Sequence, residues 1–168
     1  MTQRQPLAIL FADVSGSTKL FETRGDEVAR RLVASVLGAL AEVTQRHGGR
    51  VIKTIGDEIM CVFPGALNGL LAATDMQKRI SGDLVFARDN LAIRVGLHYG
   101  EALLEDDGDV YGDAVNTAAR MEEACEPGLV NVSGPAYEVV KPEFEWRYRG
   151  KIATKNKMEM EMYYAFIK

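Results

Sequence analysis

The chain has 168 residues, 47% apolar and 26% charged, a balance typical of one globular domain and not of a disordered, fibrous or disulfide-stapled chain. A net charge of −4 excludes a general attraction to nucleic acid or to an anionic membrane, and no apolar stretch is long enough for a membrane span or a signal peptide. For Cys61 and Cys125, far apart in sequence, we expect a reduced, cytoplasmic pair in preference to a disulfide.

The first half of the chain alternates strand and helix patterns. Apolar runs bounded by turn residues predict strands, and apolar residues at helical spacing predict helices. In chain order the expected elements are a strand (Leu7–Val14), a helix beginning near Thr18 and capped by Ser15 or Ser17, a helical stretch from Asp26 to the break at His47-Gly48-Gly49, a hairpin (Val51–Ile55 and Glu58–Phe63) and a helix (Ala66–Ile80).

The second half continues the alternation. Gly96 and Gly100 lie inside a β-rich segment, where they mark bends or close approaches. The expected elements are that β-rich segment (residues 91–104), an acidic loop, a helix (Tyr111–Ala124), a short strand (residues 129–134), a brief helix through Val139 capped by Ser133, and two strands (residues 143–150 and 158–167).

This order of elements predicts the fold class. The elements read βαββαβ with a further βαβ-like extension, and no repeat or Pro/Gly/Ser-rich linker divides them. We therefore expect a single domain over residues 1–168. Its architecture is predicted to be an α+β sandwich of ferredoxin-like type, with helices on one mixed or antiparallel sheet and a C-terminal extension.

Two acids lie where predicted strands end. Asp13 ends the first strand, and Asp57 lies in the turn of the hairpin. In a ferredoxin-like sheet that hairpin flanks the first strand, so the carboxylates converge, and such oxygen ligands suit Mg²⁺ or Mn²⁺. Taken singly, Asp13 is also interpretable as a helix cap and Asp57 as a turn residue. Glu58, beside Asp57 in a strand, is expected to point the other way.

Three further features place polar residues in unusual surroundings. The segment Ser15 to Thr18 leads into a helix, whose N–H groups can hold a polyphosphate. Asn116 and Arg120 share a helix face with small apolar neighbours, where Arg120 meets an anion, extends to solvent or pairs with an acid such as Glu123. Lys53 lies within an apolar strand, where alternation also allows a simple exposed position.

Four blocks of this sequence resemble the class III nucleotidyl cyclases, the family of adenylate and guanylate cyclase catalytic domains. The blocks follow the family's order with compatible spacing from about residue 7 to residue 132, and the similarity beyond is weaker. They are LFADVSGSTKL, GGRVIKTIGDEIMCVFP, IRVGLHYGEALL and GDVYGDAVNTAARMEE. The resemblance implies the fold of that catalytic domain and the activity of a phosphorus–oxygen lyase.

The resemblance also implies a metal and phosphate site. Asp13 and Asp57 match the family's two metal-binding aspartates, and the carbonyl of Val14 matches a backbone metal ligand. Two ions per active site, Mg²⁺ or Mn²⁺, are therefore expected. The residues whose backbone matches the phosphate-binding turn are Ser15, Gly16, Ser17 and Thr18.

Further matches imply contacts to the rest of the nucleotide. Asn116 and Arg120 match the pair that orients the ribose and stabilises the transition state, and Lys53 and Asp109 match the two positions that read the base. Lys157 matches a lysine that contacts the terminal phosphates. Because Asn156 stands where the family has glycine, Lys155 is an alternative to Lys157.

The implied reaction is the cyclisation of ATP to 3′,5′-cyclic AMP and pyrophosphate by two-metal, in-line chemistry. The choice of ATP follows from hydrogen-bonding groups, since Lys53 only donates and Asp109 only accepts. Adenine offers the matching N1 acceptor and amine donor, whereas guanine offers the reverse. Each buried polar group left unpaired costs about 1–3 kcal/mol, which favours ATP over GTP.

Partners are implied as well. In this family the metal aspartates come from one chain and the base-reading and Asn/Arg residues from the other. One chain that carries both sets predicts a two-fold homodimer with two equivalent sites. The segment between Leu104 and Asp109 is short, which implies a reduced extension toward the partner. A fused regulatory domain is also compatible, whereas no nucleic acid and no membrane insertion are expected.

Three other functions stay open at this stage. The first is a catalytically silent nucleotide-binding or regulatory domain, and the second is a guanylate cyclase. The third is a diguanylate cyclase or polymerase-palm relative, which shares two-metal chemistry on a similar sheet. The sequence Ile-Gly-Asp-Glu resembles the diguanylate signature, but the helix with Asn116 and Arg120 does not belong to that pattern.

Overall fold

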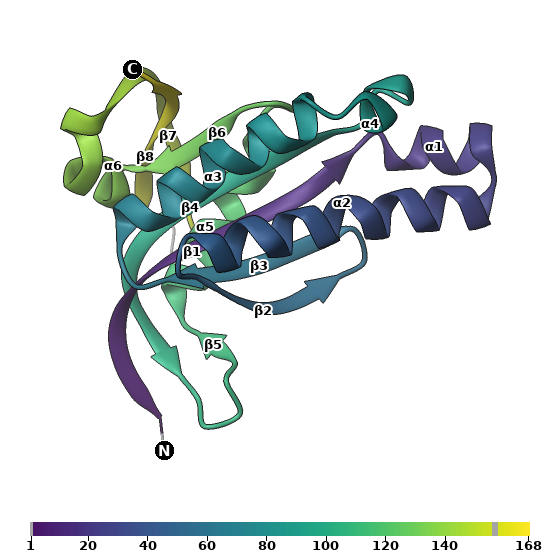
Figure 1. Ribbon diagram of the computed structural model, residues 1–168. Coiled ribbons are helices and arrows are strands. Elements are labelled where there is room, and N and C mark those ends of the chain that lie inside the picture. Colours follow the sequence, from purple (N-terminus) through teal and green to yellow (C-terminus); the bar gives the residue numbers. More distant parts are fainter. Residues whose placement is uncertain (1, 156–157) are drawn as a thin grey trace.

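The computed structural model describes residues 2–155 and 158–168. Its strands are β1 (Gln3–Ser15), β2 (Arg50–Ile55), β3 (Glu58–Phe63), β4 (Ala92–Leu104), β5 (Val110–Tyr111), β6 (Val130–Ser133), β7 (Phe144–Ala153) and β8 (Glu159–Ile167). Its helices are α1 (Ser17–Arg24), α2 (Asp26–Arg46), α3 (Ala66–Ser81), α4 (Leu84–Arg88), α5 (Asp113–Glu123), α6 (Gly134–Val140) and the short 3-10 helix η1 (Lys141–Glu143). Figure 1 traces this order from the purple N-terminus to the yellow C-terminus.

The strands form one eight-stranded sheet in the order β2-β3-β1-β4-β6-β8-β7, with β5 paired to the end of β4. The pairing of β4 with β6 is parallel, and the other pairings between described strands are antiparallel. The long strands β1 and β4 pair along their whole length, from Gln3↔Leu104 to Ser15↔Ala92. The β2–β3 hairpin lies beside β1, which confirms the α+β prediction, and β6 to β8 make up the C-terminal extension.

The two faces of the sheet are covered unequally. On β1, the alternate residues Ala8, Leu10 and Ala12 belong to the larger core, together with buried residues of α2, α3 and α6. Leu7, Ile9 and Phe11 face the other side, where a smaller core contains residues of α5. Figure 1 shows α2 and α3 over the near face of the sheet and α5 behind it. Helices α2, α3 and α5 each bury one face against the sheet, and no helix within the described residues is long and apolar enough to cross a membrane.

Helix α5 approaches the sheet most closely at Gly96. A Cβ atom placed on Gly96 would lie 2.1 Å from the backbone nitrogen of Glu122, so no larger residue fits without a shift of the helix. The same construction at Gly100 gives 2.9 Å to Nε2 of His98. Both glycines therefore mark close approaches, and β4 runs through them without a break.

Several predicted boundaries and caps were wrong. The helix expected from Tyr111 begins at Asp113, because Gly112 has φ 119° and Tyr111 pairs with β4 instead. Helix α4 was not predicted, since it has only five residues. No side chain caps α1 or α6, and the hydroxyl of Ser133 lies 2.6 Å from Nδ1 of the buried His98. Cys61 and Cys125 are buried and free.

Candidate active site

The structure brings Asp13 and Asp57 together at one end of the sheet. Asp13 is near the end of β1, and Asp57 lies in the β2–β3 turn directly after Gly56, whose φ of 61° allows the tight reversal. The N–H of Val14 donates to the carbonyl oxygen of Asp57 over 3.1 Å. This backbone bond ties the two acid-bearing segments to each other.

The carboxylate of Asp13 is partly buried, and few positive charges surround it. Its Oδ1 atom is buried and has no hydrogen-bond partner among the described residues, and Nη1 of Arg94 lies 3.7 Å away. Burial raises the pKa of Asp13 and the neighbouring charge of Asp57 adds to this effect, whereas Arg94 opposes it. A cation placed at Oδ1 would offset both the free-energy cost of burying this carboxylate and the repulsion between the two acids.

Two further carboxyl groups lie beside Asp13. Glu122 of α5 is 4% exposed, and burial followed by the charges of Asp13 and Glu58 raises its pKa to about 8. The interaction between the two carboxyl groups raises the pKa of Glu122 and lowers that of Asp13. Nothing in the helical spacing of α5 singled out Glu122, because only the contact with β4 buries it. The clue available in the sequence was Gly96, which indicated that another element packs closely against this strand but did not show which one.

Glu58 does not point away from the acids as expected. It pairs directly with Asp13 across the antiparallel β1–β3 ladder, and paired residues have their side chains on the same face. Burial raises the pKa of Glu58, with smaller contributions from Asp13 and Asp57. The prediction considered only its neighbour Asp57, which lies in the turn and not in the ladder.

The predicted phosphate-binding turn follows β1 without interruption. Gly16 has φ 93°, and its carbonyl accepts the N–H of Leu20 as α1 begins. The hydroxyl of Ser17 donates to Oδ2 of Asp57 over 2.8 Å and does not cap the helix. The turn therefore lies directly against the acid pair, with the first N–H groups of α1 beside it.

The two predicted base-reading residues are in contact. Nζ of Lys53 lies 3.2 Å from Oδ2 of Asp109, and the two side chains are 41% and 24% exposed. A hydrogen bond from the Val110 N–H, joined by bonds from Lys53 and Tyr111, keeps the pKa of Asp109 below its usual value. Asp109 thus stays an acceptor, and the loop that carries it is also held by Arg50, which donates to the carbonyl of Gly108 over 3.0 Å.

Asn116 and Arg120 lie on the half-exposed side of α5. Within the described residues, no hydrogen bond is recorded for the Asn116 side chain, whereas Nε of Arg120 donates to the carbonyl of Ala153 over 3.3 Å. Nη1 of Arg120 lies 3.5 Å from Oε2 of Glu123, so the pairing considered from the sequence exists in the single chain. Lys157 lies outside the described residues, and its alternative, Lys155, is exposed.

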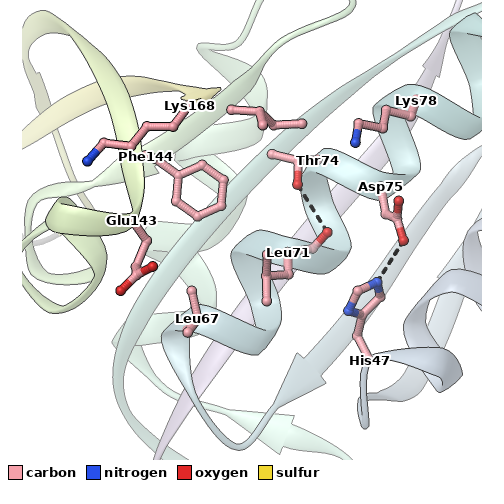
Figure 2. Close-up of a pocket in the computed structure, with 10 residues that line it drawn as sticks. His47, Leu67, Leu71, Thr74, Asp75, Lys78, Glu143, Phe144 and Lys168 are labelled. Carbon is pink, nitrogen blue, oxygen red and sulfur yellow. Dashed lines mark hydrogen bonds and ion pairs between the residues drawn. The ribbon is translucent and has the colours of Figure 1, made fainter.

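The hollow drawn in Figure 2 is separate from these residues. It has a volume of about 360 Å³ and lies between α3 and the C-terminal segment, with Leu67 and Leu71 on one wall and Phe144 on the other. It is therefore on the face of the sheet covered by α3, whereas Asp13 and α5 are on the opposite face. None of the predicted site residues within the described part of the chain lines it.

Comparison with known proteins agrees with the arrangement just described. Residues 1–166 match the family model of the adenylate and guanylate cyclase catalytic domain. An adenylate cyclase of Mycobacterium tuberculosis is 31% identical over 94% of this chain and 38% of its own length. An adenylate cyclase of Glutamicibacter nicotianae is 33% identical over 73% of this chain and 29% of its own. This chain thus spans less than two fifths of either relative.

The fold is also similar to that of a solved structure. The crystal structure of the adenylyl cyclase CyaB from P. aeruginosa superposes with a TM-score of 0.90 at 25% sequence identity, covering 100% of this chain and 97% of that one. Together with the match of the family model over nearly every residue, this likeness shows that the chain belongs to the family of adenylate and guanylate cyclase catalytic domains.

Proposed function

We propose that residues 1–168 are the catalytic domain of an adenylate cyclase that converts ATP to 3′,5′-cyclic AMP and pyrophosphate. The observation that carries this proposal is the proximity of Asp13 and Asp57, whose segments are joined by the backbone bond from Val14 to Asp57, with the turn at Gly16 directly beside them. Acids and a phosphate-binding turn in one place suit a metal–triphosphate complex. We infer a cytoplasmic location from the cysteine content alone.

The acid pair fits a site in which two divalent cations, Mg²⁺ or Mn²⁺, are bound jointly by the protein and the substrate. It does not fit a site made of protein ligands alone. In the part of the chain that is described, no three His, Cys, Asp or Glu side chains are grouped closely enough to hold a metal ion by themselves. Two carboxylates together with substrate phosphates are the usual ligand set of Mg²⁺ at a nucleotide. Asp13, Asp57 and the Val14 carbonyl would hold the ions, and the orphaned Oδ1 of Asp13 supports this fit.

The chemistry is an in-line displacement at the α-phosphorus. The ribose 3′-oxygen bonds to the α-phosphorus, the bond to the bridging oxygen of pyrophosphate breaks, and the hydroxyl proton is released to solvent. When bound, the cations lower the pKa of the 3′-hydroxyl and neutralise the triphosphate. The N–H groups after Gly16 hold the phosphates, Asn116 orients the ribose, and Arg120 donates to the charge that develops on the α-phosphate.

The Lys53–Asp109 contact supports adenine over guanine. Nζ of Lys53 donates and the ionised Asp109 accepts, and both side chains keep enough exposure to reach a ligand. Guanine would meet the lysine with its N1–H donor and the carboxylate with its O6 acceptor, leaving two mismatches of about 1–3 kcal/mol each. The contact thus arranges a donor and an acceptor side by side before the base arrives.

We infer a homodimer in which each active site takes residues from both chains. Among the described residues, no recorded hydrogen bond or ion pair joins the acid pair to Lys53, Asp109, Asn116 or Arg120. A second copy that presents its Lys53 and Arg120 sides to these acids would complete two equivalent sites. A fused regulatory domain is compatible with the greater length of the relatives.

The decisive experiment is incubation of the purified chain with ATP, and separately with GTP, in Mn²⁺ or Mg²⁺, with identification of the products by mass. We expect cyclic AMP from ATP and far less cyclic GMP. The Asp57→Asn variant should lose this activity. Asp75→Asn is the matched control, because Asp75 lies on α3 and contacts His47 away from the site.

A silent nucleotide-binding domain is the second candidate, and two observations favour it. Glu58 shares the face of Asp13, and Arg120 is engaged by Glu123 and by the Ala153 carbonyl in the single chain. Calorimetric binding of ATP by a confirmed dimer, without product in either metal, would establish this function. A cyclic dinucleotide from GTP would indicate diguanylate chemistry, which the family match does not favour.

A further inference from the structure

We propose that the hydroxyl of Ser17 is a positioning residue that orients the Asp57 carboxylate for metal binding. This inference rests on the proposed function, because it gives Asp57 the part of a metal ligand. Ser17 was singled out in the sequence for its backbone or as a helix cap. Its side chain performs a third task, since Oγ donates to Oδ2 of Asp57 over 2.8 Å.

The geometry of this bond leaves one carboxylate oxygen available. No hydrogen bond to Oδ1 of Asp57 is recorded within residues 2–155 and 158–168, so Ser17 occupies Oδ2 alone. A hydroxyl that donates to an ionised acceptor makes a stronger bond than one between neutral groups. It restricts the rotation of the carboxylate about its terminal torsion, which is otherwise broad.

The fold fixes both partners of the bond. Gly16, with φ 93°, reverses the chain after β1, and a Cβ atom there would lie 3.2 Å from the carbonyl oxygen of Asn90. The Val14 N–H holds the main chain of Asp57 over 3.1 Å. Val14 therefore fixes the backbone of Asp57 while Ser17 fixes its side chain, and both bonds come from the segment that follows Asp13.

Loss of the hydroxyl should weaken metal binding without unfolding the chain. Removing a group that orients a metal ligand typically lowers metal affinity 10–100-fold. Ser17→Ala keeps the backbone N–H at the start of α1 and removes only Oγ. Ser17→Thr keeps the hydroxyl at a position that is only half-buried.

The test measures Mn²⁺ alone, without nucleotide, by electron paramagnetic resonance of the free ion during titration of the purified chain. We expect the dissociation constant to rise 10–100-fold in Ser17→Ala and to stay within about threefold of the original chain in Ser17→Thr. Ser35→Ala is the matched control, because Ser35 donates only to the Arg31 carbonyl on α2. A thermal unfolding curve for each variant shows whether the fold is kept.

The outcomes separate this inference from the proposed function. Mn²⁺ binding of equal strength in the original chain and in Ser17→Ala would overturn the role of Ser17 and leave the metal site intact. A loss in Ser17→Ala that Ser17→Thr does not restore would also overturn it, because the hydroxyl would then not be the cause. No Mn²⁺ binding by the original chain, in a titration that reaches millimolar ion and is repeated with a non-cyclisable ATP analogue, would remove the metal site itself and the inference with it.

Discussion

Glu122 makes the stability of this domain depend on pH in a direction that can be tested. Burial raises its pKa from 4.5 to about 8, so the folded chain keeps a proton that the unfolded chain releases. Stability then falls as pH rises through this range. His98 acts oppositely, because burial lowers its pKa from 6.5 to about 4, but its contribution is nearly complete about one pH unit above 6.5. Glu122 therefore makes the larger contribution between pH 6.5 and 8.

The size of the effect follows from proton linkage. Each pH unit between the two pKa values changes the free energy of unfolding by about 1.4 kcal/mol, and this slope halves at the folded pKa. Between pH 6.5 and 8 the unfolding free energy should fall by an amount on the order of 1–2 kcal/mol, which lowers the melting temperature by about 2–8 °C for a chain of this length. In Glu122→Gln this fall should disappear, because glutamine does not titrate.

The assay is thermal or urea unfolding at several pH values in a buffer with a chelator, since a bound cation would change the protonation of Asp13 beside Glu122. Glu27→Gln is the control, because Glu27 is exposed on α2 and its loss should keep the original pH dependence. Equal slopes for Glu122→Gln and the original chain would refute the assignment of this proton to Glu122. A stability that rises from pH 6.5 to 8 would refute the direction of the argument.

Three other variants probe different parts of the site. Gly96→Ala should lower the unfolding free energy by about 1–3 kcal/mol in a urea titration, because its Cβ would lie 2.1 Å from the Glu122 nitrogen and force α5 outward. Arg120→Ala should lower kcat for cyclic AMP on the order of 10²–10³, with a smaller change in KM, and an unchanged kcat would exclude its catalytic role. Lys53→Glu should shift the ratio of ATP to GTP turnover toward GTP, since an acceptor then faces the guanine N1–H; an unchanged ratio would refute the base-reading argument.

Much of the fold was predictable because the local spacing of apolar residues predicts the same strands and helices that pack together in the sheet. The apolar run around Leu10 and the spacing of Val36, Leu40 and Val43 each specify an element that the structure contains. The errors fall where an element is short or where a glycine decides the backbone. Gly112, with φ 119°, delays the start of α5 in a way that composition alone does not reveal.

The site was predictable only in its residues that share sequence motifs. Asp13, Asp57, Lys53 and Asp109 lie in motif blocks, and the structure places the first two acids near each other and Lys53 in contact with Asp109. Glu122 was missed because its burial results from contact between α5 and β4, two elements whose packing no local period describes. Arg94 and Glu58 were missed or misplaced for a related reason, since strand register determines that both are opposite Asp13.

Helix α5 links the two parts of the proposed site through its position on β4. Its buried side places Glu122 behind Asp13, and its half-exposed side carries Asn116 and Arg120, which the proposed dimer directs to the partner's acids. Gly96 allows the backbone of α5 to lie directly against β4. A shift of α5 would therefore move the buried Glu122 and the guanidinium of Arg120 together. In the proposed dimer, any change that displaces α5 in one chain would therefore alter both active sites, one through Glu122 and the other through Arg120.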